Sequence, residues 1–152
     1  MTEYRVDSAG GYEVGDRLRL SAEPFETRVE RTAADRVSLA WPWLERDPES
    51  SERWDGTVRL PRDPDSFEHY SIPWRTDPGT SELEAGGTCS VGIPPVEVVV
   101  LEIVRHDPPA DYGFLPRPAA EMFVRPAGID DEDVGFTVYL DSPEPIEIEV
   151  LS

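Results

Sequence analysis

The chain has 152 residues, with 32 acidic side chains, 14 basic ones and a net charge of −18. This length suits one domain or two very small ones. The charge argues against sequence-independent nucleic-acid binding and against an anionic membrane surface, because both need clustered Lys or Arg.

Sixteen Pro and eleven Gly interrupt the chain every few residues, so helices of ordinary length do not fit between them. The segments that remain alternate apolar and polar residues, and this period of two predicts strands with one buried face. In chain order, the pattern predicts strands over 17–22, 25–31, 36–41, 57–60, 136–140 and 146–150.

The segment 96–104 (VEVVVLEIV) differs because it is apolar on both faces. Its β-branched side chains, directly after Pro94 and Pro95, favour a strand over a helix. The segment is predicted either to be a central strand covered on both sides or to bend between two sheets. Glu97 and Glu102 interrupt the apolar run and lower its tendency to aggregate.

Two Pro-rich, acidic and aromatic stretches, 42–56 and 61–88, lack regular alternation and are predicted to be long loops. Within the second, 69–74 (HYSIPW) has the composition of a short edge strand. The predicted fold class is all-β: a small antiparallel barrel or a two-sheet sandwich, with long Pro-rich loops and little helix.

An internal echo is visible at a spacing of 71 residues. Residues 13–29 align with 84–100 without a gap, and the apolar positions keep their parity throughout. Such a match predicts two related β-units, and duplication and coincidence both remain open as its origin. The predicted organisation is a single domain, 1–152, with repeat units 12–60 and 84–125 and a closing C-terminal hairpin, 126–152.

The first unit carries a recognisable pattern. YEVGDRLRLSAEPFETRVERTAADRVSLAWPW (12–43) places Gly-Asp before an apolar strand, then a short turn, then Asp-Arg before a strand that runs into Pro. WDGTVRL (54–60) follows, with a Gly that introduces another strand. Residues 12–60 therefore resemble the N-terminal split β-barrel of flagellar-brake-type proteins, and the resemblance implies a small barrel.

In that family the barrel is followed by a PilZ domain that binds cyclic di-GMP. The family motif is Arg-x-x-x-Arg, with a later Asp/Asn-x-Ser-x-x-Gly. Here Arg28 and Arg31 lie one residue too close, and Asp35 and Ser38 have the wrong spacing with no Gly after them. The resemblance therefore does not imply cyclic di-GMP binding for this chain.

Candidates for catalysis and metal binding are sparse. Cys89 and His106 form a nucleophilic dyad if the fold joins them; the alternative is a small, partly buried Cys in a strand. Zinc needs three or four converging ligands, and the chain has two His and one Cys. The acidic run 130–133 lacks calcium-loop spacing, and carboxylates are too abundant to single out a hydrolase pair. We therefore predict no catalytic residue, metal site or cofactor.

The aromatic loops are better candidates for binding. Trp43, Trp54, Trp74 and Arg75 combine side chains that protein interfaces favour, so they are predicted to contact a partner. The alternative is that the tryptophans cap a small barrel core. A second set, predicted to form an outward mixed-charge ladder and a weak anion site, comprises Arg17, Arg19, Arg28 and Arg59.

A single Cys89 and the lack of an apolar leader segment predict the reducing cytoplasm. The chain also lacks Lys, Asn and Gln, which genome composition, salt adaptation and partner mimicry would each explain. We hypothesise a non-catalytic accessory or regulatory protein that binds a protein partner, and the charge favours a basic one. Two alternatives stay open: an acidic immunity-type inhibitor of a basic toxin or nuclease, and a small-ligand-binding barrel or an enzyme with a carboxylate or Cys/His site.

Overall fold

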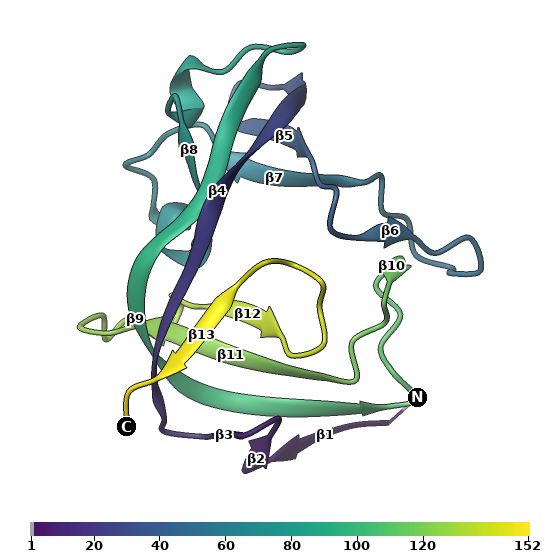
Figure 1. Cartoon of the computed structure of the whole chain (residues 1–152), viewed down its shortest axis with the longest axis vertical. Coiled ribbons are helices and arrows are strands. Elements are labelled where there is room, and N and C mark those ends of the chain that lie inside the picture. Colours follow the sequence, from purple (N-terminus) through teal and green to yellow (C-terminus); the bar gives the residue numbers. More distant parts are fainter. Residues whose placement is uncertain (1) are drawn as a thin grey trace.

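Two long antiparallel strands, β4 (Arg17–Thr32) and β9 (Thr88–Asp107), form the back of the molecule (Figure 1). The computed structural model describes residues 2–152, and in that range a nine-stranded antiparallel sheet curls around this pair. The all-β fold class that the sequence predicts is confirmed.

The first unit forms around the C-terminal half of β4. β5 (Arg36–Ala40) pairs with β4, β7 (Thr57–Pro61) pairs with β5, and β8 (Arg75–Asp77) pairs with the N-terminal part of β9. Apolar side chains alternate along these strands and meet in one core. This core contains Ala22, Val29, Val37, Leu39, Trp41, Leu44, Leu60, Trp74, Leu83, Cys89, Val91, Ile93 and Phe114.

The second unit forms around the C-terminal half of β9. β11 (Ala120–Pro126) and β1 (Thr2–Val6) pair with β9, β12 (Phe136–Tyr139) pairs with β11, and β13 (Glu147–Val150) pairs with the N-terminal part of β4. The core of this unit contains Leu18, Leu20, Val98, Val100, Ile103, Met122, Val124, Phe136 and Val138.

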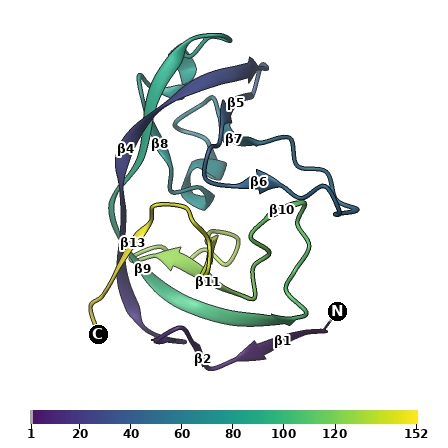
Figure 2. The same ribbon diagram turned by 45° about the vertical axis from the view of Figure 1, so that its right-hand side comes forward.

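The two units form the arms of a C, and β4 and β9 form its back (Figure 2). At the open side, β6 (Glu45–Arg46) pairs with β10 (Phe114–Leu115), so the arms also touch there. Within residues 2–152, no helix has the length and apolar character needed to cross a bilayer. The remaining elements are β2 (Ser8–Ala9), β3 (Tyr12–Glu13) and the 3₁₀ helices η1 (Phe67–Ser71) and η2 (Thr80–Glu82).

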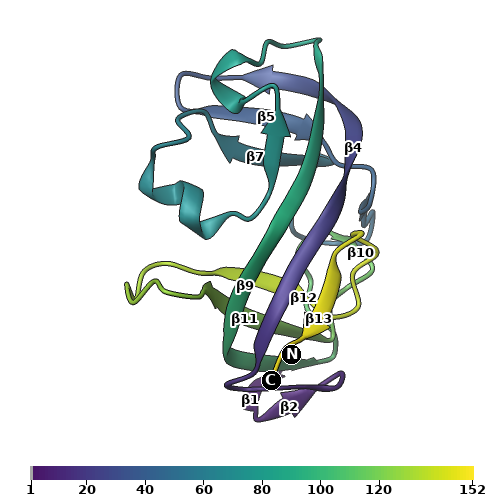
Figure 3. The same cartoon turned by 60° about the vertical axis from the view of Figure 1, so that its left-hand side comes forward.

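The strand pairing has an internal two-fold symmetry that matches the 71-residue alignment (Figure 3). Ala22 and Ile93, which align with each other, are paired near the middle of β4 and β9. The ladder between β4 and β5 skips Glu30, and the ladder between β9 and β11 skips its aligned counterpart, Leu101. The strand pairing therefore repeats at the 71-residue spacing, and duplication as the origin of the two β-units stays a prediction.

The turns that lead into the two long strands are also equivalent. Gly15 has a φ of 95° and Gly86 a φ of 85°, a region that residues with a Cβ rarely adopt. The Gly15 amide donates to the Val100 carbonyl at 2.8 Å, and the Gly86 amide donates to the Val29 carbonyl at 2.9 Å. The Glu-x-Gly sequence therefore recurs because both turns need a glycine with a positive φ.

The predicted break between the strands 17–22 and 25–31 is wrong, because β4 runs through Pro24 without ending. Proline cannot donate to a ladder, and the pairing of β4 with β9 shifts register between Ala22 and Phe25. The strand therefore tolerates a proline there. β9 serves both units as a central strand of one nine-stranded sheet, so 96–104 does not pass from one sheet to another.

Two other predictions need correction. The segment 69–74 is not an edge strand: its first part lies in η1, and β8 begins only at Arg75. Strands do form near 136–140 and 146–150, but they do not close 126–152 as a hairpin, because β12 pairs with β11 and β13 pairs with β4. β12 therefore forms its antiparallel pair with the preceding strand β11, whereas β13 returns to the long strand β4.

Candidate functional site

A cleft lies between the two arms of the C, beside the middle of β4 and β9. It has a volume of about 470 Å³, and its walls come from both units: β7 and the segment before β8 on one side, β12 and the segment before β13 on the other. Its lining is mostly apolar and includes the rings of Trp74, Phe123, Phe136 and Tyr139.

Glu144 is the acidic side chain in this lining. The strands that follow the two wall segments are equivalent, because β8 pairs with β9 at Gly92 and β13 pairs with β4 at Ser21, the residue aligned with Gly92. Ile72 lies three residues before Arg75, the first paired residue of β8. Glu144 lies three residues before Glu147, the first paired residue of β13. The scaffold accepts an apolar side chain at this place, so the fold alone does not require a carboxylate.

The Glu144 carboxylate is partly buried and held by two neutral donors. Trp41 Nε1 donates to Oε2 at 3.1 Å, and Ser142 Oγ donates to Oε1 at 3.1 Å. Burial raises the pKa of Glu144 above its usual range, and these two hydrogen bonds oppose that shift. Since Trp41 belongs to the first unit and Glu144 to the second, the contact also links the two units.

We expect the Glu144→Gln variant to gain stability relative to the wild type as the pH rises. The folded-state pKa of Glu144 is raised, so its stabilising contribution is complete below the ordinary glutamate pKa and is lost as the pH rises through the folded-state pKa. Glutamine does not ionise and keeps that contribution. Urea titrations should show little difference near pH ~4 and a higher free energy of unfolding for the variant than for the wild type near pH ~7.

The matched control for this prediction is Glu147→Gln. It removes the same charge from an exposed position on β13 and so reports the general effect of lowering the net charge of −18. Equal pH dependence in the two variants would contradict a specific contribution from buried Glu144.

Aromatic rings continue from the cleft toward a buried histidine. The ring of Tyr139 lies 6.0 Å from that of Tyr112, which in turn lies 6.2 Å from the imidazole of His106. Burial, followed by the nearby Glu121 carboxylate, raises the pKa of both tyrosines to about 12. Both phenols are therefore protonated at neutral pH and present hydroxyl groups rather than bases.

The Cys/His dyad considered from the sequence is not formed. Cys89 lies at the start of β9 in the core of the first unit, whereas His106 lies near the other end of the same strand. Burial also raises the pKa of the Cys89 thiol, which disfavours the reactive thiolate. His106 Nε2 lies 3.6 Å from Glu121 Oε2, and neither ring nitrogen has a hydrogen-bond partner among the residues that the structure describes.

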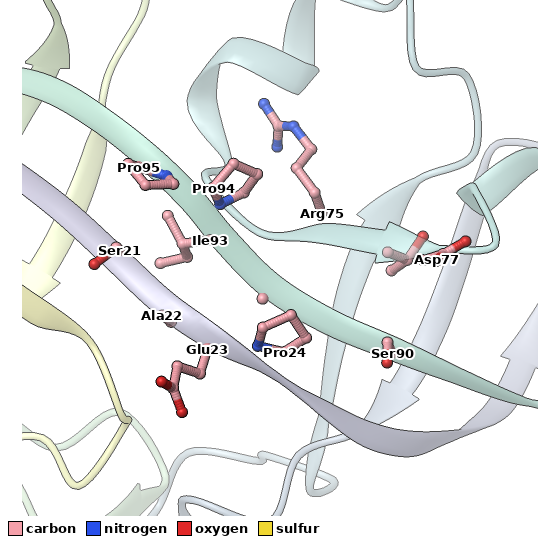
Figure 4. A pocket seen from close by; sticks show the side chains of 12 residues that line it. Ser21, Ala22, Glu23, Pro24, Arg75, Asp77, Ser90, Ile93, Pro94 and Pro95 are labelled. Carbon is pink, nitrogen blue, oxygen red and sulfur yellow. The ribbon is translucent and has the colours of Figure 1, made fainter.

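A second cavity, of about 620 Å³, lies along the middle of β4 and β9 beside β8 (Figure 4). Pro24, Pro94 and Pro95 line it and offer no backbone N–H to a ligand. Arg75 points away from β4 and donates to three backbone carbonyls within 69–74. Since this guanidinium is already bonded, its observed contacts assign it to holding the loop before β8.

The tryptophans predicted to form a partner-binding surface lie largely inside the molecule. Trp74 is only 7% exposed and its ring packs 4.8 Å from that of Trp41, so its predicted exposure is wrong. Trp43 and Trp54 are partly buried against the same core. The alternative that these rings cap a small core describes their positions better, and Arg75 is bonded internally.

The arginines predicted to form a ladder each face a carboxylate on the surface. Such exposed pairs contribute little to stability, and they leave the arginines neutralised rather than converging on one anion site. The N–O distances are 2.9 Å for Arg17 and Glu97, 3.1 Å for Arg19 and Glu149, 2.6 Å for Arg28 and Glu30, and 3.1 Å for Arg59 and Asp55.

Within residues 2–152, no three His, Cys, Asp or Glu side chains are grouped so as to hold a metal ion. Sequence reasoning missed the polar side chains that join the units: Glu144, and the ion pair of buried Asp47 with Arg117. The repeat in the sequence carries no signal for Glu144, because the 71-residue spacing aligns it with Pro73; only the strand pairing makes Ile72 its structural counterpart.

Comparison of the chain with family models, with curated proteins and with solved structures finds no match. The resemblance of 12–60 to a split β-barrel therefore stays an expectation, and a function has to be argued from the geometry of the cleft.

Proposed function

We propose that the protein is a non-catalytic binding protein that takes a small, largely apolar ligand in the cleft between its two units. The observation that carries this proposal is the cavity of about 470 Å³ with aromatic and apolar walls from both units. Cavities of this size and lining, with few polar groups, are the usual form of small-molecule sites. The ligand would be held where the two related units face each other.

The alternatives have less support in the geometry. An enzyme with a Cys/His site lacks the required juxtaposition, because Cys89 and His106 lie at opposite ends of β9. A basic protein partner is still favoured by the net charge of −18 and stays a prediction. The tryptophans and Arg75 assigned to that contact, however, are buried, partly buried or bonded internally.

The proposal is tested with 2-phenylethanol, a neutral aromatic probe small enough for the cleft. We expect saturable binding by titration calorimetry, with a dissociation constant on the order of 1 mM for so small a molecule. Thr137 is exposed and lines the cleft on β12, so Thr137→Trp should fill the space without displacing the core. This variant should bind the probe at least ~10-fold more weakly.

The control is Thr88→Trp, which adds the same ring at an exposed position at the start of β9, away from the cleft. It should bind the probe as the wild type does. Wild-type affinity in Thr137→Trp, or no binding by the wild type at all, would contradict a ligand site in the cleft.

A further inference from the structure

We infer that the cleft selects the protonated form of a primary amine: a ligand with an apolar, preferably aromatic, body and one ammonium group that pairs with Glu144. This inference rests on the proposed function and specifies the ligand class of the same cleft. Three observations support it: the Glu144 carboxylate lines the cleft, aromatic rings line the same cleft, and the two donors to Glu144 leave hydrogen-bond acceptor positions free.

The two hydrogen bonds to Glu144 leave part of its capacity free. An ionised carboxylate has about four acceptor positions, and Trp41 Nε1 and Ser142 Oγ occupy one on each oxygen. Both donors are neutral groups. Within residues 2–152, the ion pairs of the structure do not include Glu144, so its charge is not compensated inside the protein. A partly buried, uncompensated charge favours a ligand of opposite sign.

The walls of the cleft favour the same ligand. Trp74, Phe136 and Tyr139 line it, and the faces of aromatic rings attract an ammonium group. The apolar body of such a ligand would pack against these same rings. An anionic ligand would meet Glu144 and a net charge of −18, so the field of the whole protein also selects for a cation.

The geometry favours an ammonium over a guanidinium. A guanidinium uses a planar fork that needs both carboxylate oxygens in one plane, whereas an ammonium acts as a compact point charge with three rotatable donors. Each oxygen of Glu144 already accepts a bond from a different side chain. One remaining position on either oxygen is sufficient for an ammonium.

The placement of Glu144 is also asymmetric between the units. The equivalent wall of the first unit has Ile72, which packs against the core. The backbone therefore accepts an apolar residue at this place, and the Trp41 N–H needs an acceptor but not a charged one. These contacts do not require the charge of Glu144, and its place in the lining of a cavity is best explained by what the cavity binds.

The experiment compares three probes of similar shape on the full chain by titration calorimetry at neutral pH: 2-phenylethylamine, 2-phenylethanol and 3-phenylpropionate. The wild type should bind the amine at least ~10-fold more tightly than the alcohol and the acid more weakly than either. Glu144→Gln keeps an oxygen that accepts from Trp41 but removes the charge. In this variant the affinity for the amine should fall to within about twofold of the affinity for the alcohol.

Glu147→Gln is the matched control, because it removes one exposed carboxylate from β13 and should leave the preference for the amine intact. The urea titrations of Glu144→Gln show independently that this variant is folded. Equal affinity of the wild type for amine and alcohol would overturn the inference and leave the proposed function standing, as would an amine preference that survives in Glu144→Gln. Failure of both probes to bind would overturn both.

Discussion

The Asp47→Ala variant should unfold with a free energy about 3 kcal/mol below that of the wild type, which lowers Tm by roughly 6–12 °C for a chain of this size. Asp47 is only 5% exposed and lies just after β6, in the first unit. It holds Arg117, which lies between β10 and β11 in the second unit. The expected loss is large because one side chain secures the open side of the C.

Three polar contacts end on the Asp47 carboxylate. Arg117 Nε donates to Oδ2 at 2.7 Å, the Glu49 amide donates to Oδ1 at 3.0 Å, and Arg117 Nη2 lies 2.5 Å from Oδ2 in the ion pair. A hydrogen bond to a charged group contributes about 1.5–3 kcal/mol, but the partly exposed Arg117 can be hydrated once its partner is gone. The net loss in the free energy of unfolding is therefore smaller than the summed contributions of the three contacts, and we expect about 3 kcal/mol.

A double-mutant cycle checks this cause. In the Asp47→Ala background Arg117 has lost its carboxylate, so adding Arg117→Ala should produce no further loss of stability. The control is Asp130→Ala, which removes an exposed carboxylate of the acidic loop and should change the free energy of unfolding by less than about 0.5 kcal/mol. Equal stabilities of Asp47→Ala and Asp130→Ala in urea titrations would contradict a role for the ion pair in joining the arms.

Local periodicity in the sequence predicts much of the strand content. Leu18 and Leu20 are fully buried, while Arg17 and Arg19, which alternate with them, face carboxylates outside, as the alternation indicates. The structure repeats the 71-residue spacing beyond the strands themselves, because the bulge at Glu30 recurs at Leu101. Such features depend on residues close in sequence, or on the same local pattern occurring twice.

The site depends on contacts that no local pattern reports. Glu144 lies in Asp-Ser-Pro-Glu-Pro, which has the composition of an exposed turn, yet it is bonded to Trp41, 103 residues away in sequence. Trp74 lies in an irregular segment where alternation does not assign a face. Its neighbour Arg75 suggests a surface pair, but the guanidinium bonds back to local carbonyls while the ring enters the core. Packing between the units sets the contact of Glu144, and packing within the first core sets the burial of Trp74.

The Gly92→Ala variant should lose about 2–3 kcal/mol of stability, because the middle of the long strand pair has no room for a Cβ. A Cβ at Gly92 would lie 2.8 Å from the Ala22 carbonyl oxygen and 3.0 Å from the Pro24 N and Cα atoms. These are backbone atoms of β4 rather than the ends of flexible side chains. The two strands would have to separate where they pair at Ala22 and Ile93, and both units depend on that pair.

Gly79→Ala is the matched control, because a Cβ there meets nothing within 4 Å and the φ of −60° suits alanine. It should leave stability unchanged or raise it by up to about 1 kcal/mol, through a less flexible unfolded chain. Ser21, aligned with Gly92, already carries a side chain. The requirement at Gly92 therefore does not come from the repeat; it comes from the approach of Pro24 to β9. Equal urea midpoints for Gly92→Ala and Gly79→Ala would mean that β4 moves away from β9 at little cost.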